Sequence, residues 1–245
     1  MKGTRADVRL VELGLCQSRE KARSLIMSGA VYINEVRIDK AGDAVPEDCV
    51  LTVRENPNPF VSRGGLKLAK AMKAFPLSPA GKVCMDIGAS TGGFTDCMLQ
   101  NGAVKVYAVD VGYGQLAWKL RTDERVVNME RTNIRNVSLD MLEEPIQFFS
   151  VDVSFISLKH IFPVAQAITV PDACGVCLVK PQFEAGREKV GKKGVVREIS
   201  THIEVMEAAA GYAAANGFAV EGMDFSPVKG PEGNIEFLMF VRKSD

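Results

Sequence analysis

An apolar segment that runs directly into a glycine-rich turn is the feature that most constrains this 245-residue chain. Residues 83–87 (Val-Cys-Met-Asp-Ile) are followed by Gly88-Ala-Ser-Thr-Gly-Gly93 and then by a segment with helical character. Glycines let the backbone turn tightly and approach a ligand closely. The helix that follows directs the positive end of its dipole toward the turn. We therefore expect an α/β domain with a ligand site at this turn.

Apolar runs alternate with amphipathic segments through the rest of the chain, which predicts βαβ units and a mostly parallel sheet. The seven predicted strands are 83–87, 104–109, 125–129, 148–153, 174–180, 218–225 and 235–242. The predicted helices are 64–75, 93–101, 115–120, 156–168 and 199–216. The last two strands should form an antiparallel hairpin at one edge of the sheet.

The first 54 residues follow a different pattern, which predicts a small module of helices and short strands. Helices are expected over 4–13 and 19–28, the second with Ser18 as its N-cap and Gly29 as its C-terminal stop. A hairpin around Asn34-Glu35 and a strand at 50–53 should complete the module. We predict three parts: the module at 1–54, a Pro- and Asn-containing linker at 55–60, and the α/β domain at 61–245.

The charges of the chain cancel, but they are segregated along the sequence. Thirty Lys and Arg residues balance thirty Asp and Glu residues. Basic blocks nonetheless occur at 1–25 (net +3), 61–82 (net +5) and 180–197 (net +4). Clustered cations are what phosphate binding requires. If the three blocks share one face, a neutral protein presents a basic surface to RNA.

Composition also excludes several classes of protein. No apolar run reaches about 18 residues, and no apolar signal segment follows Met1, so we expect neither membrane insertion nor secretion. Six cysteines in apolar stretches favour reduced thiols in a cytoplasmic protein. The Cys174-Gly-Val-Cys177 pair has no partner pair, and we assign it no metal.

The spacing of the glycine turn indicates which ligand it binds. It is not the G-x-G-x-x-G of a dinucleotide fingerprint, and it is closer to the D/E-x-G-x-G pattern of S-adenosylmethionine (SAM) enzymes. Asp110 ends the next predicted strand, 24 residues after Asp86. A carboxylate at that position can accept both ribose hydroxyls of an adenosine. The alternative is a structural glycine turn in an α/β protein of another kind.

Two lysines and two carboxylates are candidates for a reactive site. Lys180 and Asp152 lie at the ends of predicted strands, where ligands of open α/β sheets bind. Glu236 and Lys67 are candidates to join them. The residue spacing leaves open whether the four converge or form two ordinary ion pairs.

The motifs together resemble the TlyA family of ribosomal RNA 2′-O-methyltransferases, often labelled haemolysins. Residues 5–54 resemble an S4 RNA-binding domain, in the pattern Ser18-Arg19-x-x-Ala22-x-x-Leu25-Ile26-x-x-Gly29-x-Val31-x-Ile33-Asn34. Residues 60–243 resemble an FtsJ-type methyltransferase. The strings that carry this second resemblance are 62–68, 88–96, 110–116, 130–133, 152–157, 180–186 and 230–236. The implied fold is a Rossmann-like, seven-stranded SAM-dependent methyltransferase domain with a small N-terminal α+β S4 domain.

The resemblance also implies roles for individual residues. It implies a catalytic tetrad of Lys67, Asp152, Lys180 and Glu236. The implied SAM contacts are Asp86, Gly88, Ala89, Ser90, Gly92, Gly93, Phe94, Asp110, Val111, Arg131, Thr132 and Asn133. From the basic blocks we take as RNA-binding candidates Arg5, Arg9, Arg19, Arg23, Arg63, Lys70, Lys189, Lys192 and Lys193.

The implied activity is methylation of a cytidine ribose 2′-hydroxyl in ribosomal RNA of the large subunit, and in some members also of the small one. We expect SAM as cofactor, no required metal, ribosomal subunits as partners, and a monomer or weak dimer. Our hypothesis is that Lys180 binds or deprotonates the hydroxyl, oriented by Asp152 and Glu236.

Three alternatives remain. One is a methyltransferase for another RNA or for a protein, although Asp152-Val-Ser-Phe155 favours ribose over base methylation. The second is an RNA-binding module without catalysis. The third is a pore-forming haemolysin, which the lack of a spanning segment disfavours.

Overall fold

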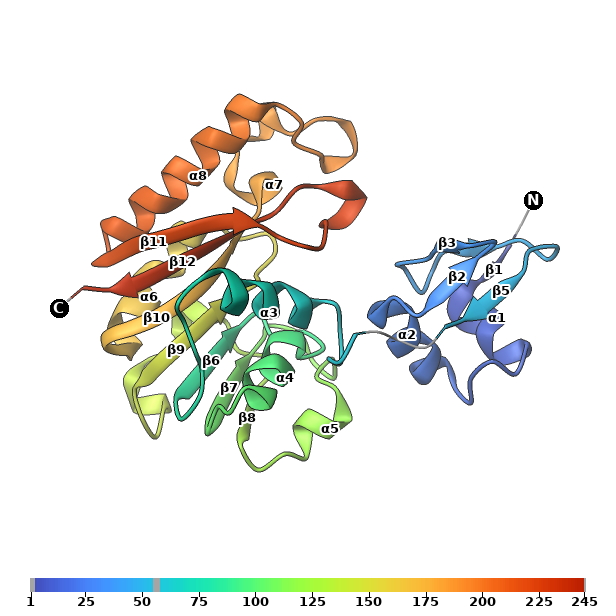
Figure 1. Ribbon diagram of the computed structural model, residues 1–245, viewed down its shortest axis with the longest axis horizontal. Coiled ribbons are helices and arrows are strands. Elements are labelled where there is room, and N and C mark those ends of the chain that lie inside the picture. Colours follow the sequence, from blue (N-terminus) through green and yellow to red (C-terminus); the bar gives the residue numbers. More distant parts are fainter. Residues whose placement is uncertain (1–2, 55–57, 245) are drawn as a thin grey trace. The chain divides into compact units, whose positions relative to one another are not determined.

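The computed structural model describes residues 3–54 and 58–244, so residues 55–57 of the predicted linker lie outside the described residues. The contacts divide the chain into an N-terminal unit, Met1–Arg63, and a C-terminal unit, Gly64–Asp245. Figure 1 labels most of the helices and strands of both units.

The N-terminal unit consists of two helices and short strands around a small apolar core. Its elements are β1 (Thr4–Arg5), α1 (Ala6–Glu12), α2 (Arg19–Ser28), β2 (Val31–Ile33), β3 (Val36–Arg37), β4 (Ala44–Val45) and β5 (Leu51–Val53). Strands β3, β2 and β5 form one sheet, and β1 pairs with β4. The core includes Leu10, Ile26 and Val31, each without exposed surface.

The residues predicted to begin and end α2 do so in the structure, and the start of α1 needs one correction. The Ser18 side chain accepts a hydrogen bond from the Lys21 amide, and Gly29 ends α2 with a φ of 82°. The predicted helix 4–13 begins instead at Ala6, because Thr4 and Arg5 pair with Val45 and Ala44. Two-residue strands carry no periodic signal, so the sequence pattern did not reveal them.

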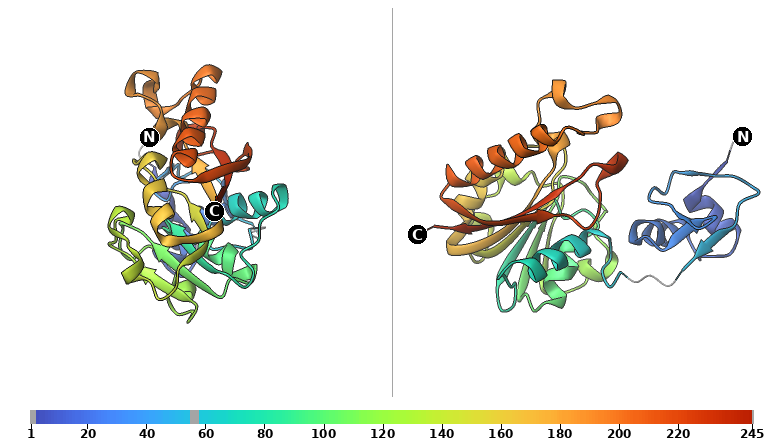
Figure 2. Two further views of the ribbon diagram at one scale, coloured as in Figure 1. Left: turned by 90° about the vertical axis from the view of Figure 1, so that its left-hand side faces the viewer. Right: turned by 45° about the horizontal axis from the view of Figure 1, so that its top comes forward.

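The C-terminal unit is a seven-stranded sheet with helices on both faces. Its main elements are α3 (Gly64–Ala74), β6 (Val83–Ile87), α4 (Gly93–Gln100), β7 (Lys105–Val109), α5 (Trp118–Arg121), β8 (Val126–Met129), β9 (Ile146–Val151), α6 (Phe162–Ile168), β10 (Thr169–Val179), α7 (Pro181–Glu184), α8 (Ile199–Ala214), β11 (Phe218–Phe225) and β12 (Phe237–Lys243). The strand order is β11-β12-β10-β9-β6-β7-β8. Strand β12 pairs antiparallel with both β10 and β11, and the other strand pairs of this sheet are parallel, which confirms the mostly parallel sheet and its edge hairpin. Figure 2 shows α3 on one face of the sheet and α6 and α8 on the other.

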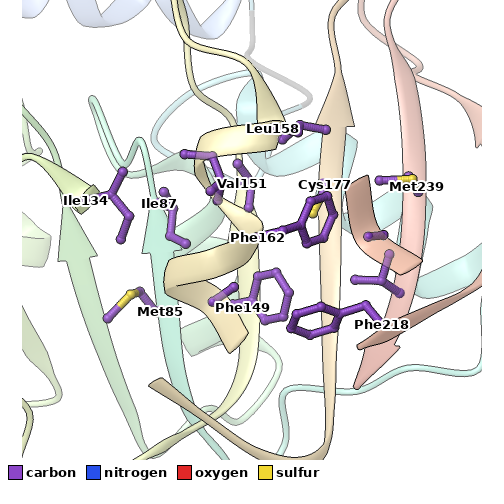
Figure 3. Close-up of a cluster of buried hydrophobic side chains, with 14 of the residues drawn as sticks. Met85, Ile87, Ile134, Phe149, Val151, Leu158, Phe162, Cys177, Phe218 and Met239 are labelled. Carbon is purple, nitrogen blue, oxygen red and sulfur yellow. The ribbon is translucent and has the colours of Figure 1, made fainter. Parts of the chain in front are cut away.

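The larger core lies between the sheet and helices α6 and α8 (Figure 3). The Phe218 ring packs at 5.6 Å from the rings of both Phe149 and Phe162. A Cβ atom at Gly175 would lie only 2.2 Å from the Phe149 ring, so this glycine makes room for the aromatic cluster. Over the described residues, no helix is long and apolar enough to cross a bilayer.

Three predicted boundaries of this unit are corrected. The predicted helix 156–168 is a 3₁₀ turn, Leu158–His160, followed by α6, which carries Pro163 in its first turn. The predicted helix 115–120 is the single turn Trp118–Arg121. Strand β10 begins at Thr169 and has an irregular register before Cys174, which accommodates Pro171 and Asp172. All six cysteines are free thiols.

Candidate active site

The register of three adjacent strands brings distant polar residues to one edge of the sheet. Val179 of β10 pairs with Phe237 of β12, and Cys177 of β10 pairs with Val151 of β9. Lys180 directly follows β10, Glu236 directly precedes β12, and Asp152 directly follows β9. Three of the four candidate residues are therefore neighbours because of the topology, and helix α3 supplies the fourth, Lys67.

The four residues form one connected network, which we call the tetrad. The Lys67 ammonium lies 3.1 Å from Asp152 Oδ2 and 2.8 Å from Glu236 Oε2. The Lys180 ammonium lies 2.5 Å from Asp152 Oδ1 and 3.4 Å from Ser154 Oγ. The alternative of two separate ion pairs is therefore wrong, because Asp152 bridges both lysines and Lys67 bridges both carboxylates.

The tetrad is enclosed, and its charges balance. The exposed fractions of the Lys67, Lys180 and Glu236 side chains are 11%, 9% and 1%. Burial alone would lower the pKa of Lys67, but the charges of Asp152 and Glu236 outweigh burial and keep that pKa raised. Burial alone would raise the pKa of Asp152, but the two lysines outweigh it and keep that pKa lowered. Both groups are held in their charged forms.

The glycine turn lies against the tetrad. Gly88 has a φ of 90°, and a Cβ atom there would come within 2.5 Å of the Asp152 carbonyl oxygen. The Asp152 amide donates to the Ile87 carbonyl. Only glycine fits this close approach. The backbone that leads into the predicted SAM turn is therefore packed directly on the backbone of a tetrad residue.

Asp86 lies beneath the glycine turn, inside the protein, and is not exposed to solvent. Its carboxylate is fully buried and accepts hydrogen bonds from the Thr95 amide at 2.9 Å, the Thr95 hydroxyl at 2.7 Å and the Ser150 hydroxyl at 3.1 Å. Burial without a cationic partner raises the pKa of Asp86 to about 6. The enclosed carboxylate ties β6 to α4, so its contribution in this structure is to fix the turn. Phe94 and Gly93 are likewise buried within α4.

Asp110 retains the chemistry that a ribose site requires. Its two oxygens accept hydrogen bonds from the Ser90 amide at 2.8 Å and the Gly112 amide at 2.7 Å. A carboxylate has about four acceptor positions, so room remains for hydroxyl donors. The side chain is partly exposed and is oriented by the turn itself. The turn and Asp110 therefore fit an adenosine-containing cofactor.

The other predicted SAM residues lie on the loops after β6, β7 and β8. The Thr132 amide donates to the Asp110 carbonyl, and the Arg131 guanidinium lies 4.0 Å from the centre of the Tyr113 ring. Asn133 accepts a hydrogen bond from the Arg135 amide at 3.1 Å. Val111 is 71% exposed. Ala89 is buried beside the exposed Ser90.

Glu130 organises these loops, and it is the first residue of the Glu130–Asn133 segment for which the family resemblance implies SAM contacts. Its carboxylate accepts hydrogen bonds from the Gln115 amide at 2.9 Å and from the Arg121 guanidinium. Burial alone would raise the pKa of Glu130, but Arg121 and backbone amides outweigh it and lower that pKa to about 2. Glu130 belongs to the string 130–133, which is one of those that carry the resemblance to the methyltransferase family.

Most RNA-binding candidates are held by ion pairs. Arg5, Arg19 and Arg23 all donate to Asp7, which is fully buried. We call these four residues the Asp7 cluster. The other pairs are Arg9 with Glu12, Arg63 with Asp39, Lys70 with Asp224 and Lys189 with Glu204. Lys192 and Lys193 are exposed on the loop before α8.

Phe155 is a residue that the sequence reasoning did not single out. It lies three residues after Asp152, is 91% exposed and has a positive φ of 63°. Its ring centre is 4.9 Å from that of Phe183, and Lys180 Nζ lies 5.9 Å from the Phe183 ring centre. Phe155 is therefore an exposed aromatic residue in a strained conformation, and it contacts a second ring, Phe183, that lies near the buried Lys180. The two rings offer a stacking surface close to the tetrad. In the described part of the chain, no three metal-binding side chains gather.

Two family models cover nearly all of the chain. Residues 60–243 match the FtsJ-like methyltransferase model, and residues 4–48 match the S4 domain model. "Putative rRNA methyltransferase YqxC" of Bacillus subtilis (strain 168) is 56% identical over 98% of this chain and 86% of its own length. The "16S/23S rRNA (cytidine-2'-O)-methyltransferase TlyA" of Mycobacterium tuberculosis (strain CDC 1551 / Oshkosh) is 43% identical over 97% of this chain and 89% of its own length.

Solved structures agree with these matches. "Putative hemolysin from Streptococcus thermophilus" has a TM-score of 0.79 at 49% identity, over all of this chain and 90% of that one. The "Crystal structure of putative S-adenosylmethionine dependent methyltransferase from Listeria monocytogenes" has a TM-score of 0.52 at 17% identity, over 75% of this chain and all of that one. The second similarity supports the fold alone.

Proposed function

The chain belongs to the TlyA family, which joins an S4 domain to an FtsJ-like methyltransferase domain, and from this premise we propose that it methylates a cytidine ribose 2′-hydroxyl in ribosomal RNA. Methyl transfer to ribosomal RNA is the broad activity of its named relatives. The narrower cytidine 2′-O assignment comes from a relative that is 43% identical. The single observation that carries the proposal is the tetrad, packed against the glycine turn through Gly88 and Asp152.

The reaction requires accurate positioning and the removal of one proton. A ribose hydroxyl is a weak nucleophile at neutral pH, and in-line displacement forms a C–O bond as a C–S bond breaks. SAM, when bound, supplies the electrophilic methyl group. We assign Asp110 to the ribose of this cofactor, and the glycine turn, Val111 and residues 131–133 to its surroundings.

Within the tetrad each residue has a separate task. Lys180 binds the 2′-hydroxyl as an ammonium, or takes its proton as a neutral amine after losing one of its own protons to solvent, and Asp152 fixes Lys180 through the 2.5 Å contact. Lys67 lies between Asp152 and Glu236, so it allows two carboxylates to occupy one enclosed site. Phe155 provides an aromatic face for a base that has left its stack, as single-stranded RNA recognition requires.

The remaining expectations form part of the same proposal. The three parts 1–54, 55–60 and 61–245 act as S4 domain, linker and methyltransferase domain. The arginines of the Asp7 cluster, with Arg9, Arg63, Lys70, Lys189, Lys192 and Lys193, contact RNA phosphates. The protein acts in the cytoplasm on ribosomal subunits, as a monomer or weak dimer, and requires no metal.

The test is transfer of labelled methyl groups from SAM to unmodified 30S and 50S subunits, followed by mapping of the modified nucleotide. Wild-type protein should label a cytidine ribose. Lys180→Ala should reduce transfer by about a thousandfold or more, while the dissociation constant for SAM, measured by calorimetry, stays within about twofold. Lys105→Ala is the matched control, because Lys105 is also ion-paired but lies at the amino end of β7.

Other outcomes would favour the alternatives. Label on a base, or on transfer RNA in place of the subunits, would support a different RNA methyltransferase. Lysis of red cells by purified protein would support a haemolysin. Full transfer by Lys180→Ala would remove Lys180 from the mechanism.

A further inference from the structure

Two loops that are far apart in the sequence are joined by the side chain of Asn234. Its Oδ1 accepts a hydrogen bond from the Val196 amide at 3.1 Å, and its Nδ2 donates to the Gly194 carbonyl at 2.9 Å. The Asn234 residue is only 3% exposed. It therefore links the turn 230–236 to the loop 191–196, which Figure 1 draws at the same end of the sheet.

The turn 230–236 transmits the position of Asn234 to a tetrad residue. The Gly230 amide donates to the Asn234 carbonyl at 2.9 Å, which closes the turn. Glu232 and Gly233 have positive φ values of 55° and 87°. A Cβ atom at Gly230 would lie 2.3 Å from Glu236 Oε1, so the turn backbone rests on the Glu236 carboxylate. A shift of the turn must therefore move or release Glu236.

The loop 191–196 presents the two exposed lysines of the third basic block. Lys192 and Lys193 lie at its tip, and Lys193 has a positive φ of 72°. The base of the loop is fixed, because the Gly191 amide donates to the Val195 carbonyl, and His202 Nε2 lies 3.2 Å from the Val196 carbonyl. Two cations are thus carried on a short loop whose inner side contacts Asn234.

An amide is the side chain that this junction requires. It donates to one loop and accepts from the same loop in a single plane. An aspartate would keep the acceptor for Val196 but would lose the donor for Gly194. An alanine would leave the amide of the buried Val196 and the Gly194 carbonyl without this partner.

We propose that Asn234 is a positioning residue, through which RNA phosphates held by Lys192 and Lys193 fix Glu236 within the tetrad. The proposal rests on the proposed function and adds that substrate contact and alignment of the site are coupled. The tetrad is already assembled in the structure, so seated RNA would hold Glu236 in place within it, and methyl transfer to a poorly bound substrate would be slow.

The experiment is a double-mutant cycle with single-turnover methyl transfer to purified ribosomal subunits. The variants are Asn234→Ala, Lys192→Ala with Lys193→Ala, and all three together. Each of the first two should lower the transfer rate at saturating subunits by about 10- to 100-fold, because small misplacements in an active site have large kinetic effects. The combined variant should be no slower than the slower parent, since the coupling is already lost.

Controls separate this coupling from a structural defect. Asn216→Ala removes a comparable hydrogen bond, from Nδ2 to the Tyr212 carbonyl at the end of α8, and should leave the rate unchanged. The dissociation constant for SAM should stay within about twofold in every variant. If Asn234→Ala fails to fold, Asn234→Asp replaces it in the cycle, because it retains the bond to Val196.

The outcomes are distinct. Losses that multiply in the combined variant would overturn the coupling, and so would a wild-type rate for Asn234→Ala. Either result leaves the proposed function intact. Failure of the wild-type protein to label any subunit would defeat the proposed function, and the coupling would fall with it.

Discussion

Both units of the molecule bury carboxylates among cations, but they expose those cations very differently. In the Asp7 cluster, one fully buried carboxylate receives three arginines whose side chains are 52–54% exposed. In the tetrad, two carboxylates balance two lysines that are 11% and 9% exposed. The first arrangement has an excess of positive charge at the surface, and the second is neutral and enclosed.

This difference indicates what each network can do. Each guanidinium has five N–H donors, and Asp7 takes at most two from any one of them. The remaining donors face solvent, so the cluster can bind phosphates. The tetrad instead withholds its charges from water, which suits a site that positions one hydroxyl and one proton.

The largest effect should follow removal of the carboxylate that bridges both lysines. Asp152→Ala leaves Lys67 and Lys180 buried near each other without their shared partner, at a cost of about 3–5 kcal/mol in unfolding free energy. Urea denaturation followed by circular dichroism measures this loss. A loss below about 1 kcal/mol would mean that water solvates the lysines as freely as it does the surface arginines.

The next largest effect on stability is expected at Asp86, a buried carboxylate without a cationic partner. Because the pKa of Asp86 is raised to about 6, the native protein binds an extra proton between about pH 4 and pH 6, and stability falls as pH rises through this range. Asp86→Asn removes this penalty, which is at most about 3 kcal/mol at neutral pH. The stability of the variant relative to wild type should therefore increase from pH 4 to pH 7. A difference that stays flat over this range would contradict the prediction.

A smaller effect, with the opposite dependence on pH, is expected in the Asp7 cluster. Hydrogen bonds from Arg5, and from Arg19 and Arg23, hold the pKa of Asp7 well below its usual range. Its stabilisation is therefore present above about pH 4 and is lost as pH falls further. Asp7→Ala should cost about 1–3 kcal/mol at pH 7, because the arginines it leaves behind can be solvated. Hydrogen exchange of the α1 and α2 amides localises the loss, and equal losses at pH 3 and pH 7 would argue against the ion-pair origin.

The smallest effect is expected where both partners of an ion pair are exposed. Arg9 and Glu12 are three residues apart on α1, at 3.3 Å, with side chains 25% and 48% exposed. Arg9→Ala should change the unfolding free energy by less than about 0.5 kcal/mol. If Arg9 contacts RNA, this variant separates binding from stability, because ribosomal-subunit affinity falls while the melting temperature stays constant. A large loss of stability would show that the exposure of an ion pair does not predict its contribution to the unfolding free energy.

The sequence predicted the parts of the fold that local patterns encode. Segments rich in apolar residues predicted β6 and β11 with the same bounds, and Ser18 and Gly29 predicted the start and stop of α2. Boundaries failed where a local exception intervened. Pro163 restarts a helix after a 3₁₀ turn, and the irregular register before Cys174 hides the first half of β10.

The site was predictable as a set of residues but not as an arrangement. Strand ends indicated Lys180 and Asp152, with Lys67 and Glu236 as candidates to join them, and the family resemblance supplied the role of a tetrad. Their connection depends on the insertion of β12 beside β10, which sets Val179 opposite Phe237. Neither the role of Asp7 nor the link made by Asn234 has a periodic signal, because both depend on contacts between segments.

The bond between Lys67 and Glu236 joins residues separated by 169 positions, and this separation has a consequence for synthesis. A nascent chain that has reached Lys180 already carries three tetrad residues, yet β12 has still to be made. Because contacts of such long sequence separation form late, the tetrad is completed only after β12 is threaded between β10 and β11. On the proposed function, translation of most of the sheet therefore precedes methyl transfer, because Glu236 takes its place in the tetrad only with β12.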